Sequence, residues 1–497
     1  MTSRRMKISR FFRHRQHPLK MVEYSSRNLW LLLIPLSKYL IASRFNFQEW
    51  IRTNWVDILA ISGIFALALL RWIFVRFDIE PDGITAHSGI FGIVSTKIYF
   101  SQLTSVSFCQ SWYGRPFKVH TIYAETNAKT VSREDLKLVL SGKNADLLYE
   151  FISNGEYVKP KVTYSPRKLH LMIFSLIFSS ALSGVLLYGT FMFEVYKILG
   201  LKTEQQMLRR VNGEIDKLDR QLFNLSKLVP RAVLLIAVIV MLCWSISFIA
   251  TLARHWSFTV SRSKDQFYIR SGAMIKRRHI INRDKINYYD LTQTLLMKLF
   301  RICSVTLDCT GYGKRRREIS ALIPITTYRR VTTTLRLLTP DLPLPKPEVR
   351  TGTASDVRRF VTLPAVCSVL PIVAMKLLEH TFMGRHREIN ALLVIITVPL
   401  LWLVIVKAAA SFNTSVGFSE QGCVMNYCRW YKFHKVFLPK SNISRIRIVR
   451  NPLQMLNHTC TLKIYTVGES GRCHTMFSLP YDDVRAVCMR EGYVLFE

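Results

Sequence analysis

The chain has 497 residues, of which 49% are hydrophobic, and its 69 lysines and arginines against 33 acidic residues give a formal net charge of +36. This length excludes a single small domain. The charge fits a nucleic-acid binder or a protein at an anionic membrane surface. Because the apolar residues are grouped into long segments, the sequence favours a membrane over nucleic acid as the anionic partner. Each basic residue close to an anionic membrane contributes ~1 kcal/mol of attraction.

Six apolar segments occur in three pairs along the chain. Most of them reach the ~20 residues that a helix needs to cross a ~30 Å hydrocarbon core. The sequence therefore predicts six transmembrane helices arranged as three hairpins. The pairs are Asn28–Phe45 with Trp55–Val75, Leu169–Phe193 with Ala232–Leu252, and Phe360–Leu378 with Ile389–Ala408. The first segment is short and is interrupted by Lys38, so it could lie along the surface instead of crossing.

The distribution of basic residues predicts the orientation in the membrane. The first 27 residues hold eight lysines and arginines against one acidic residue, which places the N-terminus in the cytoplasm by the positive-inside rule. An even number of spans then returns every polar block and the C-terminus to that side. The ten cysteines form no C-x-x-C pair, as expected for reduced thiols in a cytoplasm-facing protein. We expect a multi-pass protein of a bacterial inner membrane.

A polar, strand-patterned block follows each apolar pair, and the three blocks share features. Ser88-Gly89 and Ser271-Gly272 recur, and a β-hairpin with the glycine at its turn explains them. Alternation of apolar and polar residues predicts equivalent strands at His120–Ala124, Cys303–Cys309 and Thr461–Val467. A helical pattern ends each block, at Asn144–Ile152, Tyr328–Leu338 and Tyr481–Arg490. Five to seven strands closed by one helix predict a small barrel or sandwich.

This order of spans and blocks, with its hairpin and its closing helix, resembles the bacterial pleckstrin-homology-like (PH-like) membrane proteins of the YdbS/YdbT kind. The length resembles the longer, three-repeat YdbT-like member. The third block departs from the pattern, because Gly422-Cys423 stands in place of Ser-Gly. The resemblance implies an α+β membrane protein in which each hairpin is followed by a PH-like split β-barrel capped by a C-terminal helix. It implies no catalytic residues.

The predicted organisation has seven parts. They are a basic N-terminus at 1–27, hairpin 1 at 28–75, PH-like domain 1 at 76–158, hairpin 2 at 169–252 with an external insert at 201–229, PH-like domain 2 at 253–340, hairpin 3 at 360–408, and PH-like domain 3 at 409–497.

The insert carries a heptad pattern. Apolar residues with strict 3,4 spacing predict a coiled-coil seam for self-association or for a partner, and an amphipathic helix on the membrane surface is the alternative. The seam residues are Leu208, Val211, Ile215, Leu218, Leu222, Leu225 and Val229.

Two basic runs in the second block are the sharpest polar feature. In an antiparallel barrel both could fall in loops at one end, where arginine forks suit phosphate headgroups; a solvated loop that obeys the positive-inside rule is the alternative. The candidate residues for binding anionic lipid or a partner are Lys276, Arg277, Arg278, Lys314, Arg315, Arg316 and Arg317. Nucleic acid is disfavoured, because no aromatic stacking platform is interleaved with the charges.

Catalytic signatures are missing from the sequence, and we expect neither an enzyme nor a cofactor. His380 and His386, with Glu379 and Glu388, could hold a metal, but exposed histidines in a short loop are usually unliganded, so no metal is predicted. We expect binding and scaffolding at the membrane; a lipid or small-molecule transporter gated by its PH-like domains is the alternative. The resemblance suggests a smaller one-barrel PH-like membrane protein as a partner, beside lipids and a homo-oligomer, and a role in envelope maintenance or resistance to membrane-active agents.

Overall fold

The structure is a computed structural model, and the elements below come from the part of the chain that it describes. Those residues are 13–25, 48, 51–52, 55–89, 94–126, 136–153, 162–178, 231–263, 265–309, 312, 320–340, 342, 346–351, 354–381, 386–467 and 472–493.

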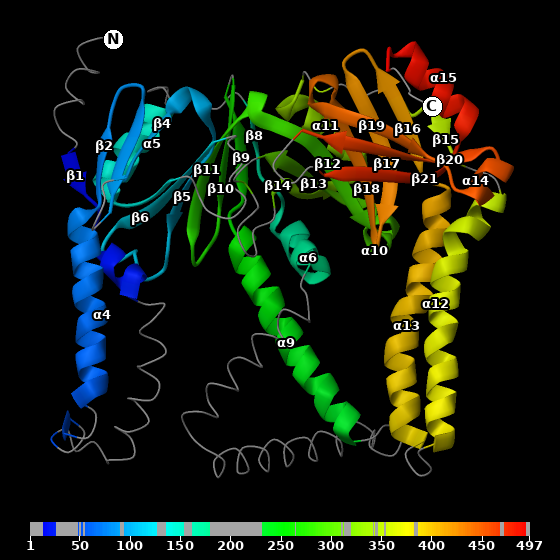
Figure 1. The fold of residues 1–497 in the computed structure, drawn as a ribbon, viewed down its shortest axis with the longest axis horizontal. Coiled ribbons are helices and arrows are strands. Elements are labelled where there is room, and N and C mark those ends of the chain that lie inside the picture. Colours follow the sequence, from blue (N-terminus) through cyan, green and yellow to red (C-terminus); the bar gives the residue numbers. More distant parts are fainter. Residues whose placement is uncertain are drawn as a thin grey trace.

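The chain is built from three units with the same order of elements. In each unit a short first strand precedes the apolar helices, and six further strands and a closing helix follow them (Figure 1). Unit 1 contains β1 (Arg13–Arg15), α4 (Trp55–Phe74), β2 (Arg76–Ile79), β3 (Gly83–Ser88), β4 (Val94–Tyr99), a 3₁₀ turn (Phe100–Gln102), β5 (Leu103–Gln110), β6 (Val119–Thr126), β7 (Leu136–Ser141) and α5 (Gly142–Ile152).

Unit 2 repeats this order, with a short additional helix between its fifth and sixth strands. It contains β8 (Val162–Tyr164), α6 (Lys168–Phe178), α9 (Arg231–His255), β9 (Thr259–Arg262), β10 (Gln266–Ser271), β11 (Lys276–Asn282), a 3₁₀ turn (Arg283–Lys285), β12 (Ile286–Thr294), α10 (Leu295–Leu299), β13 (Ile302–Cys309), β14 (Ala321–Thr327) and α11 (Tyr328–Leu338).

Unit 3 keeps the order although its sequence departs from the hairpin pattern. It contains β15 (Val349–Arg350), α12 (Ala354–Thr381), α13 (His386–Ser411), β16 (Ser415–Ser419), β17 (Gly422–Arg429), β18 (Lys432–Pro439), a 3₁₀ turn (Lys440–Asn442), β19 (Ile443–Val449), α14 (Pro452–Leu456), β20 (Thr459–Thr466), β21 (Cys473–Pro480) and α15 (Tyr481–Arg490).

Local patterns predicted many of these elements. The closing helices and the equivalent strands β6, β13 and β20 are confirmed to within a few residues. The turn glycine is confirmed at Gly272, whose φ is +102°, and a Cβ there would lie 1.9 Å from the Ile275 carbonyl oxygen. The first strand of each unit was missed, because two or three residues carry too little alternation to be recognised. The predicted domain ranges start after the hairpins, whereas β1, β8 and β15 precede them.

The units are joined by strand pairing. The sheet orders are β1-β2-β3-β4, β7-β6-β5-β11-β10-β9-β8, β14-β13-β12-β18-β17-β16-β15 and β19-β20-β21. The fifth strand of one unit therefore pairs with the fourth strand of the next, as β5 with β11 and β12 with β18. The expectation of three split barrels needs correction, because no barrel is closed among the described strands. The strand edges of β5 and β12 are occupied by the following unit, so the sheets run on from unit to unit.

Each unit keeps its own hydrophobic core, and the seams share side chains between cores. Ile280 of β11 packs in the core of unit 1, and Tyr288 of β12 packs in the core of unit 3. Val424 and Phe437 of unit 3 pack in the core of unit 2. Burying a large apolar side chain contributes ~1.5–3 kcal/mol, so these exchanged residues make neighbouring units stabilise one another.

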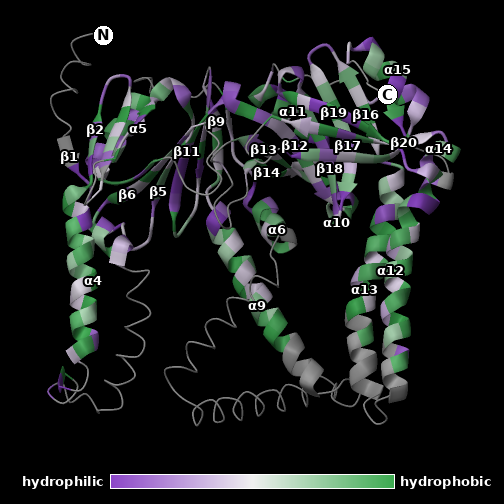
Figure 2. Cartoon of the chain, viewed as in Figure 1, coloured by the Kyte–Doolittle hydropathy of each residue, from purple (hydrophilic) through white to green (hydrophobic). Residues whose placement is uncertain are grey.

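Three helices among the described residues are long and apolar enough to cross a membrane: Trp55–Phe74, Val238–His255 and Asp356–Ala374. In Figure 2, hydrophobic residues predominate along α4 and along the coloured parts of α9 and α12. They indicate membrane association. Six spans were expected; the described apolar part of α13, Ile396–Ser411, is shorter. The predicted Asn28–Phe45 segment, most of Leu169–Phe193 and the 201–229 insert with its seam lie outside the described residues.

Candidate functional site

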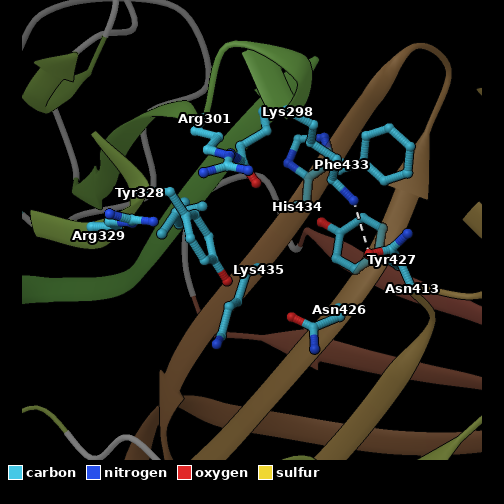
Figure 3. Close-up of a pocket in the computed structure, with 12 residues that line it drawn as sticks. Lys298, Arg301, Tyr328, Arg329, Asn413, Asn426, Tyr427, Phe433, His434 and Lys435 are labelled. Carbon is cyan, nitrogen blue, oxygen red and sulfur yellow. Dashed lines mark hydrogen bonds between the residues drawn. The ribbon is translucent and has the colours of Figure 1, made fainter. Parts of the chain in front are cut away.

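A cavity of about 500 Å³ opens at the seam between units 2 and 3 (Figure 3). Its walls come from β12, α10 and the start of α11 in unit 2, and from β17, β18 and Asn413 after α13 in unit 3. The lining residues are Leu291, Gln293, Lys298, Arg301, Tyr328, Arg329, Asn413, Asn426, Tyr427, Phe433, His434 and Lys435.

Strand register builds one wall. Leu291 of β12 is opposite Lys435 of β18, and Lys435 is in turn opposite Asn426 of β17. Directly paired residues of antiparallel strands point to the same face of a sheet. These three side chains, together with Gln293 and its partner Phe433, therefore face the cavity from a single surface that exists only because the two units pair.

The opposite wall depends on a turn after α10. Arg301 adopts a φ of +53°, a conformation that non-glycine residues rarely take. Its carbonyl oxygen accepts a 2.8 Å hydrogen bond from the Tyr328 backbone NH at the start of α11. Gln293 donates from Nε2 to the Ile302 carbonyl oxygen at 2.8 Å. These contacts hold Arg301, Tyr328 and Arg329 beside one another, as Figure 3 shows.

The lining is cationic. It holds Lys298, Arg301, Arg329 and Lys435, and none of its twelve residues is acidic. Such a site suits an anion, because ionised donors make hydrogen bonds roughly twice as strong as neutral ones and arginine binds phosphate through two parallel bonds.

Lys298 is the most constrained of these cations. Its Nζ donates to Asn413 Oδ1 at 2.8 Å and lies 3.7 Å from the centre of the Phe433 ring. Burial lowers the pKa of Lys298 to about 8. Burial, followed by the nearby charge of Arg350, also lowers the pKa of Lys435. A bound anion would offset the cost of burying these charges.

A polar network on the same strands includes two of the lining residues, Tyr427 and His434. His434 Nδ1 lies 2.8 Å from Asp290 Oδ2, and the His434 ring stacks on Tyr427 with centroids 5.1 Å apart. The Tyr427 hydroxyl lies 2.8 Å from His474 Nδ1. Burial raises the pKa of Tyr427 and lowers that of His474 to about 4, so both stay neutral at pH 7 and fix the strands that carry Phe433 and Lys435.

The first of the two basic runs predicted from sequence lies elsewhere. Lys276, Arg277 and Arg278 are in β11, in the seam between units 1 and 2, where a loop was expected. Arg278 pairs with Asp146 at 3.3 Å and lies over the Tyr149 ring at 5.9 Å. The second run, Lys314 to Arg317, lies outside the described residues. That the two runs form one binding site therefore stays a prediction.

Sequence reasoning missed the cavity because its cations are scattered singly between positions 298 and 435. Lys298, Arg301 and Arg329 belong to unit 2, and the pairing of β12 with β18 adds Lys435 of unit 3 to them. The described residues contain no group of three potential metal ligands. The side chains of His380 and His386 are not described.

A known family matches two parts of the chain. The model of the bacterial PH domain matches residues 31–155 and 220–339. The chain is a member of the bacterial PH domain family, with internal repeats. The matches include β2–α5 and β9–α11. Unit 3 lies outside both matches and shares the order of elements of the matched units. Neither curated proteins nor solved structures gave a match.

Proposed function

We propose that this bacterial PH domain protein is a membrane-embedded binding protein whose basic cavity between units 2 and 3 holds the phosphate of an anionic lipid headgroup. The observation that carries this proposal is the set of four cationic side chains around one cavity whose lining contains no carboxylate. Asn413, another lining residue, comes two positions after the end of α13. The cavity therefore lies close to where an apolar helix meets the units.

The proposed topology has six spans in three hairpins in a bacterial inner membrane, with all three units and both termini in the cytoplasm. In its support, α4, α9, α12 and α13 all leave the same side of the sheets (Figure 1). The net charge of +36 favours the cytoplasmic side for the units. Large side chains on these helices are open to a lipid environment; Leu59 is 64% exposed and Leu363 is 72% exposed.

The protein would also act as a scaffold for another PH-like unit. At both internal seams a fifth strand pairs with a fourth strand of the next unit. The corresponding edges at the two ends are β4 and β19, and no described strand pairs with either on its outer side. Exposed strand edges are templates for pairing with another chain. A smaller PH-like membrane protein, or a second copy of this chain, fits these edges.

Lipid retention tests the cavity. The full chain would be extracted in detergent and incubated with phosphatidylglycerol or with phosphatidylcholine, and bound lipid would be counted by native mass spectrometry. We expect preferential retention of phosphatidylglycerol, reduced at least about a hundredfold by Arg301→Gln with Arg329→Gln, because the double variant loses two charge-assisted bonds of ~1.5–3 kcal/mol each.

Arg336→Gln is the matched control. Arg336 is an exposed arginine in the last turn of α11, outside the cavity, and its replacement should leave retention unchanged. Equal retention of both lipids, or equal loss in both variants, would contradict the proposal.

A further inference from the structure

Three short segments occupy the same place in the three units, between the fifth and sixth strands. They span residues 111–118, 295–301 and 450–458, and are called the tip segments below. Each ends on a non-glycine residue in the left-handed region: Lys118 at φ +51°, Arg301 at +53° and His458 at +48°. Such conformations are rare, so their recurrence at one position identifies the segments as a repeated structural feature.

Each tip segment exposes large apolar side chains. Nine of them are between 47% and 80% exposed: Trp112, Tyr113, Phe117, Leu296, Leu299, Phe300, Leu453, Met455 and Leu456. The tip segments also contain basic residues and no acidic ones. Clusters of exposed apolar residues on soluble surfaces mark interaction sites.

Hydrogen bonds place the first two tip segments at the ends of apolar helices. Arg115 donates to the Ala273 carbonyl oxygen, and the Ala273 NH bonds to the carbonyl oxygen of Ala253 in α9 at 2.7 Å. In unit 2, Lys298 donates to Asn413 at 2.8 Å, and the Asn413 NH bonds to the carbonyl oxygen of Ala410 in α13 at 3.0 Å. Both segments therefore lie where a helix leaves the sheets.

A different contact places the third tip segment at the end of an apolar helix as well. Arg359 of α12 donates from Nη1 to Thr459 Oγ1 at 3.2 Å, and Thr459 directly follows His458 at the end of the segment. The span Asp356–Ala374 includes Arg359. Figure 1 shows α10 and α14 toward the helix side of the sheets, and α5, α11 and α15 toward the opposite side.

We infer that the three tip segments insert into the interfacial layer of the membrane that the helices cross, and hold the row of units against an anionic bilayer. Aromatic and other large apolar residues favour the headgroup boundary, and the adjacent basic residues favour anionic lipids. A protein partner is a less suitable occupant, because all three segments lie level with helix ends, where lipid is the nearest surface. The inference rests on the proposed membrane embedding.

Photolabelling by lipid tests it. The full chain would be placed in nanodiscs of phosphatidylethanolamine and phosphatidylglycerol that contain a phospholipid with a diazirine near the glycerol end of its acyl chain. Labelled peptides would be identified by mass spectrometry. We expect labelling of the tip segments at several times the level of Leu147, Leu337 and Met489, which are 49%, 55% and 53% exposed on the three closing helices.

The outcomes separate two failures. Labelling of the span Trp55–Phe74 without the tip segments overturns the insertion and leaves the embedding intact. No labelling of the spans overturns the embedding, and with it both proposals. A variant tests whether the labelling is specific to each segment. Replacing Leu296, Leu299 and Phe300 with serine should abolish labelling of 295–301 and leave labelling of 111–118 unchanged. Loss of labelling at both segments would contradict insertion by separate segments.

Discussion

His434 of β18 lies 2.8 Å from Asp290 of β12, and this pair joins unit 3 to unit 2 across their shared seam. Both side chains are largely buried, at 16% and 14% exposure. His434 itself lines the cavity, and the same two strands carry the lining residues Leu291 and Lys435. The pair therefore links the association of the units to the shape of the cavity.

Removing the carboxylate of this pair should loosen the seam. Asp290→Ala leaves the His434 ring without its acceptor, and a buried group without its partner costs about 1–3 kcal/mol. We expect faster hydrogen exchange at the amides of β12 and β18. Asp146→Ala is the control, because the Asp146–Arg278 pair is exposed and such pairs contribute about 0.2–1 kcal/mol. Equal effects of the two substitutions would show that the seam does not depend on the buried pair.

Binding of anionic lipid should weaken as the pH rises through about 8. Lys298 has a pKa of about 8 because of its burial, so it is mainly charged at pH 7 and mainly neutral at pH 9. Retention of phosphatidylglycerol, followed by native mass spectrometry after exchange into each buffer, should fall over this range. Lys298→Arg should remove the pH dependence, because arginine stays charged. The same fall in this variant would assign the titration to another group.

Acid should destabilise unit 3 through His474. Burial lowers its pKa to about 4 from an ordinary value of 6.5. Between these values the unfolded chain takes up the proton more readily than the folded chain, so the free energy of unfolding falls as the pH decreases from 6.5 to 4. The loss amounts to at most about 3 kcal/mol at ~1.4 kcal/mol per pH unit. His474→Gln keeps a hydrogen-bond partner for Tyr427 and should make the unfolding midpoint less dependent on pH between 6.5 and 4. The same pH dependence in this variant would exclude His474 as its source.

Gly272 should tolerate no side chain. Its φ is +102°, and a Cβ would meet the Ile275 carbonyl oxygen at 1.9 Å. Gly272→Ala should therefore introduce about 1–3 kcal/mol of backbone strain into the folded protein and lower its thermal unfolding midpoint. Gly63→Ala is the control, because a Cβ on Gly63 in α4 meets nothing within 4 Å. A midpoint unchanged by both substitutions would mean that the β10–β11 hairpin can shift to accept the methyl group.

Local periodicity and segment length were enough to predict the threefold repeat, the closing helices and three of the apolar helices from the sequence. Tyr328–Leu338 and Tyr481–Arg490 were predicted with the bounds that the structure has. The turn at Gly272 was predictable for the same reason, since a backbone that needs positive φ selects glycine locally.

How the units meet became known only from the tertiary structure. Strand pairing between units depends on backbone hydrogen bonds that any sequence can make, so the sequences of β5 and β12 do not predict which strands they pair with. For the same reason Lys276–Arg278 proved to be part of a seam strand, and the cavity of Lys298, Arg301, Arg329 and Lys435 was not foreseen. Its residues are distant in sequence, and Lys435 joins the three cations of unit 2 only because β12 and β18 run side by side.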